Sequence, residues 1–151
     1  MVDKEFEETI SDFIGFVCFV LDIEEPGYTF DAELATPTTM AAYSPSHDLL
    51  YMNPNYCVEY ALPLMMVCVA HEMRHKWQHE NNSQVFSGYK KSSEIDLNTY
   101  NKQAVEIDAN AFAVAFMDKY LSGWDQTGLK NKFLGNAETK KRYKEIKRTL
   151  K

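Results

Sequence analysis

Two histidines separated by three residues are the clearest chemical signal in the chain. The segment His71-Glu72-Met73-Arg74-His75 has the pattern H-E-x-x-H. On a helix, residues four apart lie one turn apart on the same face, so both imidazoles can reach one metal ion. Glu72 is rotated by about 100° from His71, which places its carboxylate beside the ion, where it can take a proton from water. The pattern is typical of a catalytic zinc site.

The residues before this motif predict a helix that runs through the core. They are apolar on all sides: Leu64, Met65, Val67, Cys68 and Val69. A five-residue match alone also occurs on solvated helices with two ordinary histidines. Histidines that emerge from a buried helix need polar partners, however, and one metal ion can serve as the partner of both.

A catalytic zinc site takes a third protein ligand besides water. The chain has four histidines. His79 continues the same helical face but lies about 12 Å along the axis from His71, too far for one ion on a straight helix. His47 precedes the motif in a turn and is a weaker candidate. Because no histidine follows residue 79, a ligand further along the chain must be a carboxylate.

Two carboxylates qualify on the helix predicted over residues 101–121. Small or short residues share the face of Glu106: Ala109, Asn110 and Ala113. A second helix can approach that face closely, so we predict Glu106 as the third zinc ligand and Asn110 as a hydrogen-bond partner of a zinc-binding histidine. Asp108 points roughly 200° away and is expected to be solvated or to accept a local hydrogen bond. On an ordinary amphipathic helix, both carboxylates would be surface acids.

The two motifs together resemble those of the ImmA/IrrE family of gluzincin metallopeptidases. The resemblance lies in His71-Glu72-x-x-His75, in Glu106-x-x-Ala109-Asn110-x-Phe112-Ala113 about thirty residues later, and loosely in residues 44–54. It implies a zinc ion, a compact zincin-like fold and hydrolysis of an intracellular protein, often a repressor. We recognise no counterpart of the family's frequent DNA-binding domain, and the basic segment from Lys130 onward is not part of the shared motif.

In the mechanism that these residues suggest, Glu72 removes a proton from water and later passes it to the leaving amine. Three side chains could donate a second hydrogen bond to the oxyanion: Tyr89, Tyr100 and His79. An extended substrate could add to the edge of a hairpin, around residues 38–43 or 49–52. The alternative is a metal-binding interaction module without turnover, associated with a repressor or nucleic acid. A purely structural site would have no use for Glu72.

The apolar pattern predicts an α+β fold around the zinc-binding helix. We expect helices over residues 5–21, 62–80, 101–121 and 137–151. Residues 28–43 are expected to hold one or two strands, 48–52 to form a strand paired across the turn at 44–47, and 84–98 to form a loop. With the resemblance, this predicts one minimal zincin-like domain over 1–151, with a small antiparallel sheet or hairpin on the active-site helix.

Charge is distributed unevenly along the chain, whose net charge is −6. Residues 130–151 carry nine Lys or Arg and two Glu, a net charge of +7 that leaves −13 for the rest. The overall acidity argues against nucleic acid as a partner. A protein or peptide substrate is what the resemblance implies. For the basic cluster we favour a solvated helix packed on the acidic body over a nucleic-acid contact. The cluster comprises Lys140, Lys141, Arg142, Lys144, Lys147 and Arg148.

The remaining features indicate a cytoplasmic protein without membrane contact. The three cysteines are odd in number and lie in apolar stretches, as reduced core residues do. The acidic segment 1–8 does not open like a secretory signal. The apolar run 13–21 is too short to span a bilayer, which takes roughly 20 residues.

Overall fold

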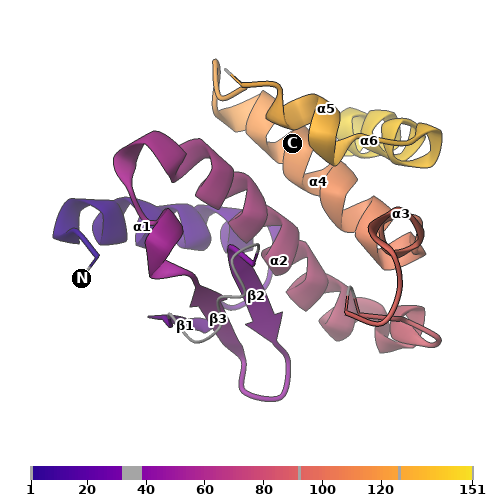
Figure 1. The fold of residues 1–151 in the computed structure, drawn as a ribbon, viewed down its shortest axis with the longest axis horizontal. Helices are drawn as coiled ribbons and strands as arrows, with labels where there is room; N and C mark the ends of the chain where they lie inside the picture. Colours follow the sequence, from indigo (N-terminus) through magenta and orange to yellow (C-terminus); the bar gives the residue numbers. More distant parts are fainter. Residues whose placement is uncertain (1, 32–38, 92, 126, 151) are drawn as a thin grey trace. The chain divides into compact units, whose positions relative to one another are not determined.

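The computed structural model describes residues 2–31, 39–91, 93–125 and 127–150. They form two compact units, Met1–Lys76 and Trp77–Lys151. In these ranges the chain forms six α-helices and three short strands, which confirms the predicted α+β class (Figure 1). None of the helices in the described ranges combines the length and apolar character that crossing a bilayer requires.

The first unit begins with helix α1, Lys4–Leu21. The Asp3 side chain caps it by accepting hydrogen bonds from the backbone N–H groups of Glu5 and Phe6. One face is buried at helical spacing: Phe6, Ile10, Phe13, Ile14, Val17, Cys18 and Leu21. The helix ends at Asp22, whose left-handed backbone (φ 56°) turns the chain toward the sheet. The helix predicted over 5–21 is confirmed.

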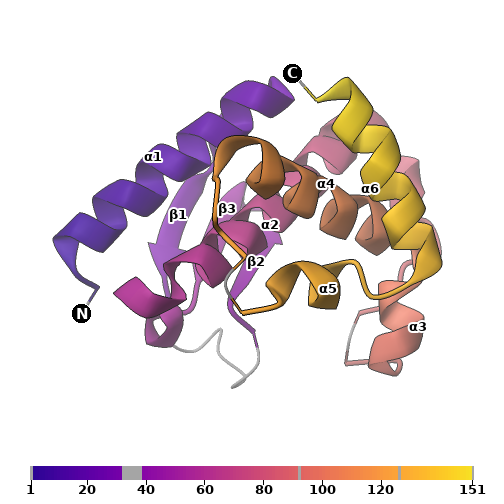
Figure 2. The same ribbon diagram turned by 90° about the horizontal axis from the view of Figure 1, so that it is seen from above.

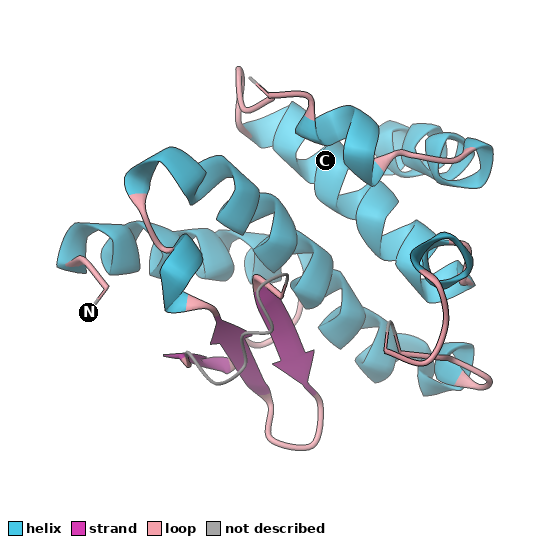
Figure 3. Cartoon of the chain, in the orientation of Figure 1, coloured by secondary structure: helices cyan, strands magenta, loops and turns pink. Residues whose placement is uncertain are grey.

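A three-stranded sheet follows, with β1 (Gly27–Phe30), β2 (Ala41–Ser44) and β3 (Leu49–Met52) in the order β1-β3-β2. Strands β2 and β3 form the predicted antiparallel hairpin (Figure 3). Strand β1 lies on the other side of β3 and runs parallel to it, so the sheet is mixed and not antiparallel. Residue 38 of the predicted strand edge lies outside the described residues.

Helix α2, Leu62–Asn82, starts in the first unit and continues into the second, which confirms the helix predicted over 62–80. Two short 3₁₀ turns, Pro54–Tyr56 and Glu59–Ala61, lead into it. Its buried residues include Met65, Val67, Val69, Ala70 and Met73. The Sγ of Cys18 lies 3.6 Å from the Sδ of Met73, so α1 and α2 are in contact through sulfur atoms.

The second unit contains a 3₁₀ turn (Ser83–Phe86), α3 (Leu97–Asn101), α4 (Ala104–Tyr120), α5 (Leu129–Phe133) and α6 (Ala137–Thr149). The prediction of one helix from residue 101 is wrong at its start, because α3 ends at Asn101 and Gln103 has an extended backbone (ψ 140°) before α4. Residues 105, 106 and 109–117 of α4 are all buried. The basic segment is helical as expected, and α6 packs along α4 (Figure 2).

Asp118, near the end of α4, joins three segments of the second unit. Its carboxylate accepts hydrogen bonds from Nε1 of Trp124 (2.9 Å), Nζ of Lys130 (2.7 Å) and the hydroxyl of Tyr143. Burial alone would raise the pKa of Asp118, but these hydrogen bonds and the Lys130 charge hold it below its usual value. One carboxylate therefore fixes α5 and α6 to the C-terminal end of α4.

Candidate metal centre

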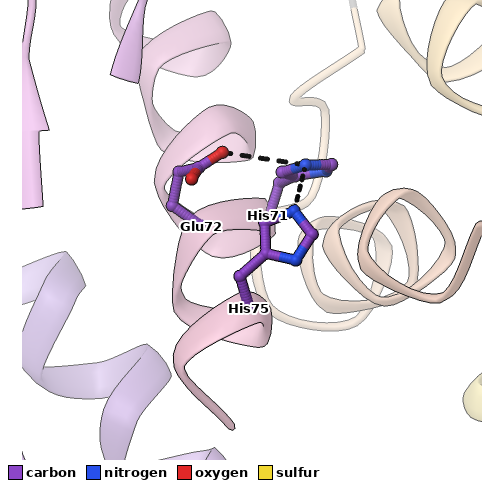
Figure 4. A group of neighbouring side chains, drawn as sticks. All are labelled: His71, Glu72 and His75. Atoms are coloured by element: carbon purple, nitrogen blue, oxygen red, sulfur yellow. Dashed lines mark hydrogen bonds and ion pairs between the residues drawn. The ribbon is translucent and has the colours of Figure 1, made fainter. Parts of the chain in front are cut away.

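Helix α2 brings the two motif histidines together. The Nε2 atoms of His71 and His75 lie 3.0 Å apart, and their rings meet nearly at right angles with centroids 4.6 Å apart. Figure 4 shows both rings turned toward one another from successive turns of the helix. His75 is buried and the His71 side chain is 12% exposed. The i, i+4 spacing thus gives the convergence that the sequence predicted.

The distance between these nitrogens fits a shared metal ion. Two ligands at 2.0–2.1 Å from a tetrahedral zinc ion are about 3.3 Å apart, a few tenths of an ångström from the separation in this structure. Without an ion, a contact this short requires one ring to donate its Nε2 proton to the other. If a cation took the place of that proton, the donor ring would carry its proton on Nδ1 instead, and both Nε2 lone pairs would serve as ligands.

Glu72 adds a carboxylate beside the histidine pair. Its Oε2 lies 3.7 Å from Nε2 of His71, and its Oε1 accepts the backbone N–H of Tyr43 at 3.0 Å. The donor atoms of His71, Glu72 and His75 all lie within 4.8 Å of one another. The carboxylate is thus held between an edge strand and the histidines, close enough to act on water or on an ion at the pair.

The β2–β3 hairpin is anchored to α2 one turn beyond Glu72. The ammonium of Lys76, whose side chain is 3% exposed, lies 2.7 Å from Oδ1 of Asp48. The hydroxyl of Tyr43 donates to the same oxygen at 2.8 Å. Burial would raise the pKa of Asp48, but the hydrogen bonds from Lys76 and Tyr43 bring it below its usual value. Sequence reasoning missed this anchor, although Lys76 follows Glu72 at i+4 and Asp48 directly follows the predicted turn.

Glu106, the predicted third ligand, is on α4 in the second unit and is 1% exposed. The hydroxyl of Tyr89 donates to its Oε2 at 3.1 Å and lies 3.0 Å from the hydroxyl of Tyr100. Tyr89 has a single proton to give, so it accepts from Tyr100 while it donates to the carboxylate. Of the residues considered as oxyanion donors, Tyr89 therefore binds Glu106 directly and Tyr100 binds Tyr89. A carboxylate this buried is not a surface acid, and burial requires ionic or hydrogen-bonding partners.

Asp108 has a different environment from Glu106. It accepts hydrogen bonds from Nε2 of Gln78 (2.8 Å) and Nε of Arg142 (2.8 Å), so it joins the C-terminal part of α2, α4 and α6. Asp108 is an acceptor, as expected, but its donors are 30 and 34 residues away in the chain and not local. The expectation of a solvated side chain is wrong, since 16% of the side chain is exposed. Asn110 is buried on α4, and its role beside a zinc-binding histidine stays a prediction.

The other two histidines are engaged elsewhere. The Nδ1 of His47 lies 3.0 Å from Oγ of Ser44 and 3.1 Å from Oγ of Ser46, within the hairpin turn. The ring of His79 stacks on Phe86 with centroids 3.8 Å apart. In the described part of the chain, the group of possible metal ligands comprises His71, Glu72 and His75. Glu106 as the third ligand stays a prediction.

Comparison of the chain with protein-family models, with curated proteins and with solved structures finds no match. Function must therefore be argued from the residues and their geometry.

Proposed function

We propose that this protein is a zinc-dependent metallopeptidase of the gluzincin type with a zincin-like fold. The observation that supports the proposal best is the pair of Nε2 atoms, 3.0 Å apart on a largely buried helix, with the Glu72 carboxylate 3.7 Å from one of them. A pair of histidine ligands alone also occurs in structural metal sites. Hydrolysis of a peptide bond needs in addition a carboxylate that stands beside the two ligands and is not itself one of the i, i+4 pair.

Each residue has a distinct task in this proposal. His71, His75 and Glu106 hold the zinc ion, and Asn110 orients a histidine ligand. Zinc, when bound, supplies Lewis acidity toward water and the scissile carbonyl. Glu72 takes the proton of the attacking water on Oε2 and later gives it to the leaving amine. The Tyr43 N–H holds Oε1, which keeps the second oxygen directed at the histidines.

The edge strand β2 suits an extended protein or peptide substrate. It is the outer strand in the order β1-β3-β2, and Tyr43 presents its N–H away from β3, toward Glu72. Residues two apart on a strand face the same edge, so the backbone of Ala41 is available on that edge for a peptide in extended conformation. Such a peptide would lie next to Glu72. In keeping with the resemblance, we propose an intracellular protein as the natural substrate.

Hydrolysis of a quenched fluorescent peptide library tests the proposal. We expect cleavage by the zinc-loaded protein, loss of cleavage in chelator and its return on adding zinc. The Glu72→Gln protein is the matched control, because it retains the fold and the histidines. Cleavage that survives both the chelator and Glu72→Gln would come from another source and would contradict the proposal.

A further inference from the structure

Helix α6 carries a stripe of cations on its exposed face. The basic stripe consists of Lys140, Lys141, Lys144, Lys147 and Arg148, all of them exposed. At 100° and 1.5 Å per residue, these five positions fall within an arc of about 120° and extend over about 12 Å. Glu138 and Glu145 lie outside this arc. The stripe is therefore a continuous positive surface.

This stripe is not used to hold the helix in place. Uncharged residues form the buried face of α6: Thr139, Tyr143 and Ile146. The ion pairs that hold α5 and α6 involve other cations, namely Lys130 with Asp118 and Arg142 with Asp108. Among the residues that the structure describes, the stripe forms no ion pair, and the one hydrogen bond from its side chains runs from Lys147 to the Tyr143 hydroxyl. The sequence favoured a solvated helix, and α6 indeed packs on α4 and leaves these cations in solvent.

The two units also differ in charge. Met1–Lys76 has 13 Asp or Glu and 3 Lys or Arg, a net charge of −10, whereas Trp77–Lys151 has 9 and 13, a net charge of +4. The acidity of the whole chain thus belongs to the first unit. A polyanion that approaches α6 meets the basic unit. At ordinary salt, screening limits the electrostatic field of each charge to roughly 10 Å, so the charges near α6 act on the polyanion most strongly.

We propose that the basic stripe binds the phosphate backbone of a nucleic-acid duplex without reading its sequence. Lysine and arginine contacts to phosphates supply nearly all of such binding. A protein partner is less suited, because interface cores are rich in aromatic residues and depleted of lysine, and none of the exposed large apolar residues of the described chain is on α6. Insertion into a membrane surface needs an apolar helix face, and that face of α6 is buried against the protein.

Fluorescence anisotropy of the full-length protein with a labelled 20-base-pair DNA duplex, at 50–200 mM NaCl, tests this proposal. Each neutralised phosphate contributes about −0.9 to the slope of the logarithm of the binding constant against the logarithm of the salt concentration. Five cations therefore predict a slope no steeper than about −4.5. We expect Lys140→Gln/Lys141→Gln/Lys144→Gln to weaken binding about tenfold or more and to reduce the slope by about 2.7. The single variant Lys144→Gln should reduce it by about 0.9, and serves if the triple variant folds poorly.

The matched control is Lys90→Gln/Lys91→Gln/Lys102→Gln, which removes the same charge from exposed lysines of the same unit outside α6. It should keep nearly full affinity. The proposal would be overturned if the protein did not bind the duplex at 50 mM NaCl, or if both triple variants weakened binding equally. It would also be overturned if the protein bound phosphatidylserine vesicles but not the duplex. A fourth contrary result would be salt-sensitive self-association that is lost in the stripe variant, without duplex binding. The last would assign the stripe to the acidic unit of a second copy. None of these outcomes depends on the zinc site.

Discussion

Glu72 makes two different contacts, and substitutions can separate them. Its Oε1 accepts the N–H of Tyr43 at 3.0 Å, and its Oε2 lies 3.7 Å from Nε2 of His71. Glu72→Gln keeps an oxygen for Tyr43 and replaces the other oxygen by an NH₂ group, which cannot accept a proton. Glu72→Ala removes both contacts. If Glu72 is a base and not a ligand, zinc should remain in both variants.

The expected magnitudes differ for stability and activity. Glu72→Gln turns a hydrogen bond to a charged acceptor, worth about 1.5–3 kcal/mol, into a neutral one worth about 0.5–1.5 kcal/mol. We therefore expect a loss of about 1 kcal/mol, or about 2–4 °C in Tm, and roughly twice that for Glu72→Ala. Loss of a general base should lower kcat by about 10²–10⁴, which raises the barrier by about 3–5 kcal/mol.

The assay combines zinc content, thermal melting and hydrolysis of a quenched peptide on the same preparations. The reasoning predicts full zinc content, a small fall in Tm and a large fall in kcat for Glu72→Gln. Zinc loss in this variant, with both histidines intact, would show that Glu72 is a ligand, which its distance from the histidine nitrogens also allows. Undiminished kcat would refute its role as the base.

Three further predictions concern the second unit. Glu106→Ala should lower zinc affinity at least tenfold in a chelator competition. Asp108→Ala removes the same charge, but it should leave zinc affinity unchanged and lower Tm by a few degrees. The reverse pattern would refute the assignment of the third ligand. Asn110→Ala should weaken zinc binding by roughly ten- to a hundredfold in isothermal titration, and an unaltered affinity would remove it from the site. Asp118→Asn should cost about 1–2 kcal/mol of unfolding free energy at pH 7. Because folding lowers the pKa of Asp118, this stabilisation is present above the usual pKa near 3.8 and is lost as pH falls through the pKa of the folded protein. Urea titrations at pH 7 and pH 3 should therefore show that the difference in unfolding free energy between wild type and variant shrinks at low pH. A constant difference would contradict the pairing with Lys130.

Local patterns were sufficient to predict the elements that hold the motif. The spacing of apolar residues predicted the first helix, because burial of one helix face leaves a 3.6-residue period. The turn Ser44-Pro45-Ser46-His47 predicted the β2–β3 hairpin, and the i, i+4 spacing predicted that His71 and His75 converge. Each of these features depends on residues close in sequence.

Features that depend on distant residues could not be predicted. The parallel pairing of β1 with β3 is set by tertiary packing, which strand propensity does not encode. Lys76 and Asp48 are 28 residues apart, and nothing in either segment alone requires them to pair. The break between α3 and α4 was missed because Lys102-Gln103 contains neither glycine nor proline, so it lacks the usual signal for a helix end.

Zinc stoichiometry is the most direct test of the central claim. The wild-type protein and the His71→Ala/His75→Ala protein should be stripped with a chelator, reloaded with excess zinc, freed of unbound zinc and titrated against a chromophoric chelator. The account predicts about one tightly bound zinc ion per wild-type chain and none in the double variant, since the two Nε2 atoms 3.0 Å apart are its proposed ligands. Equal zinc binding by the two proteins, or none by either, would contradict it.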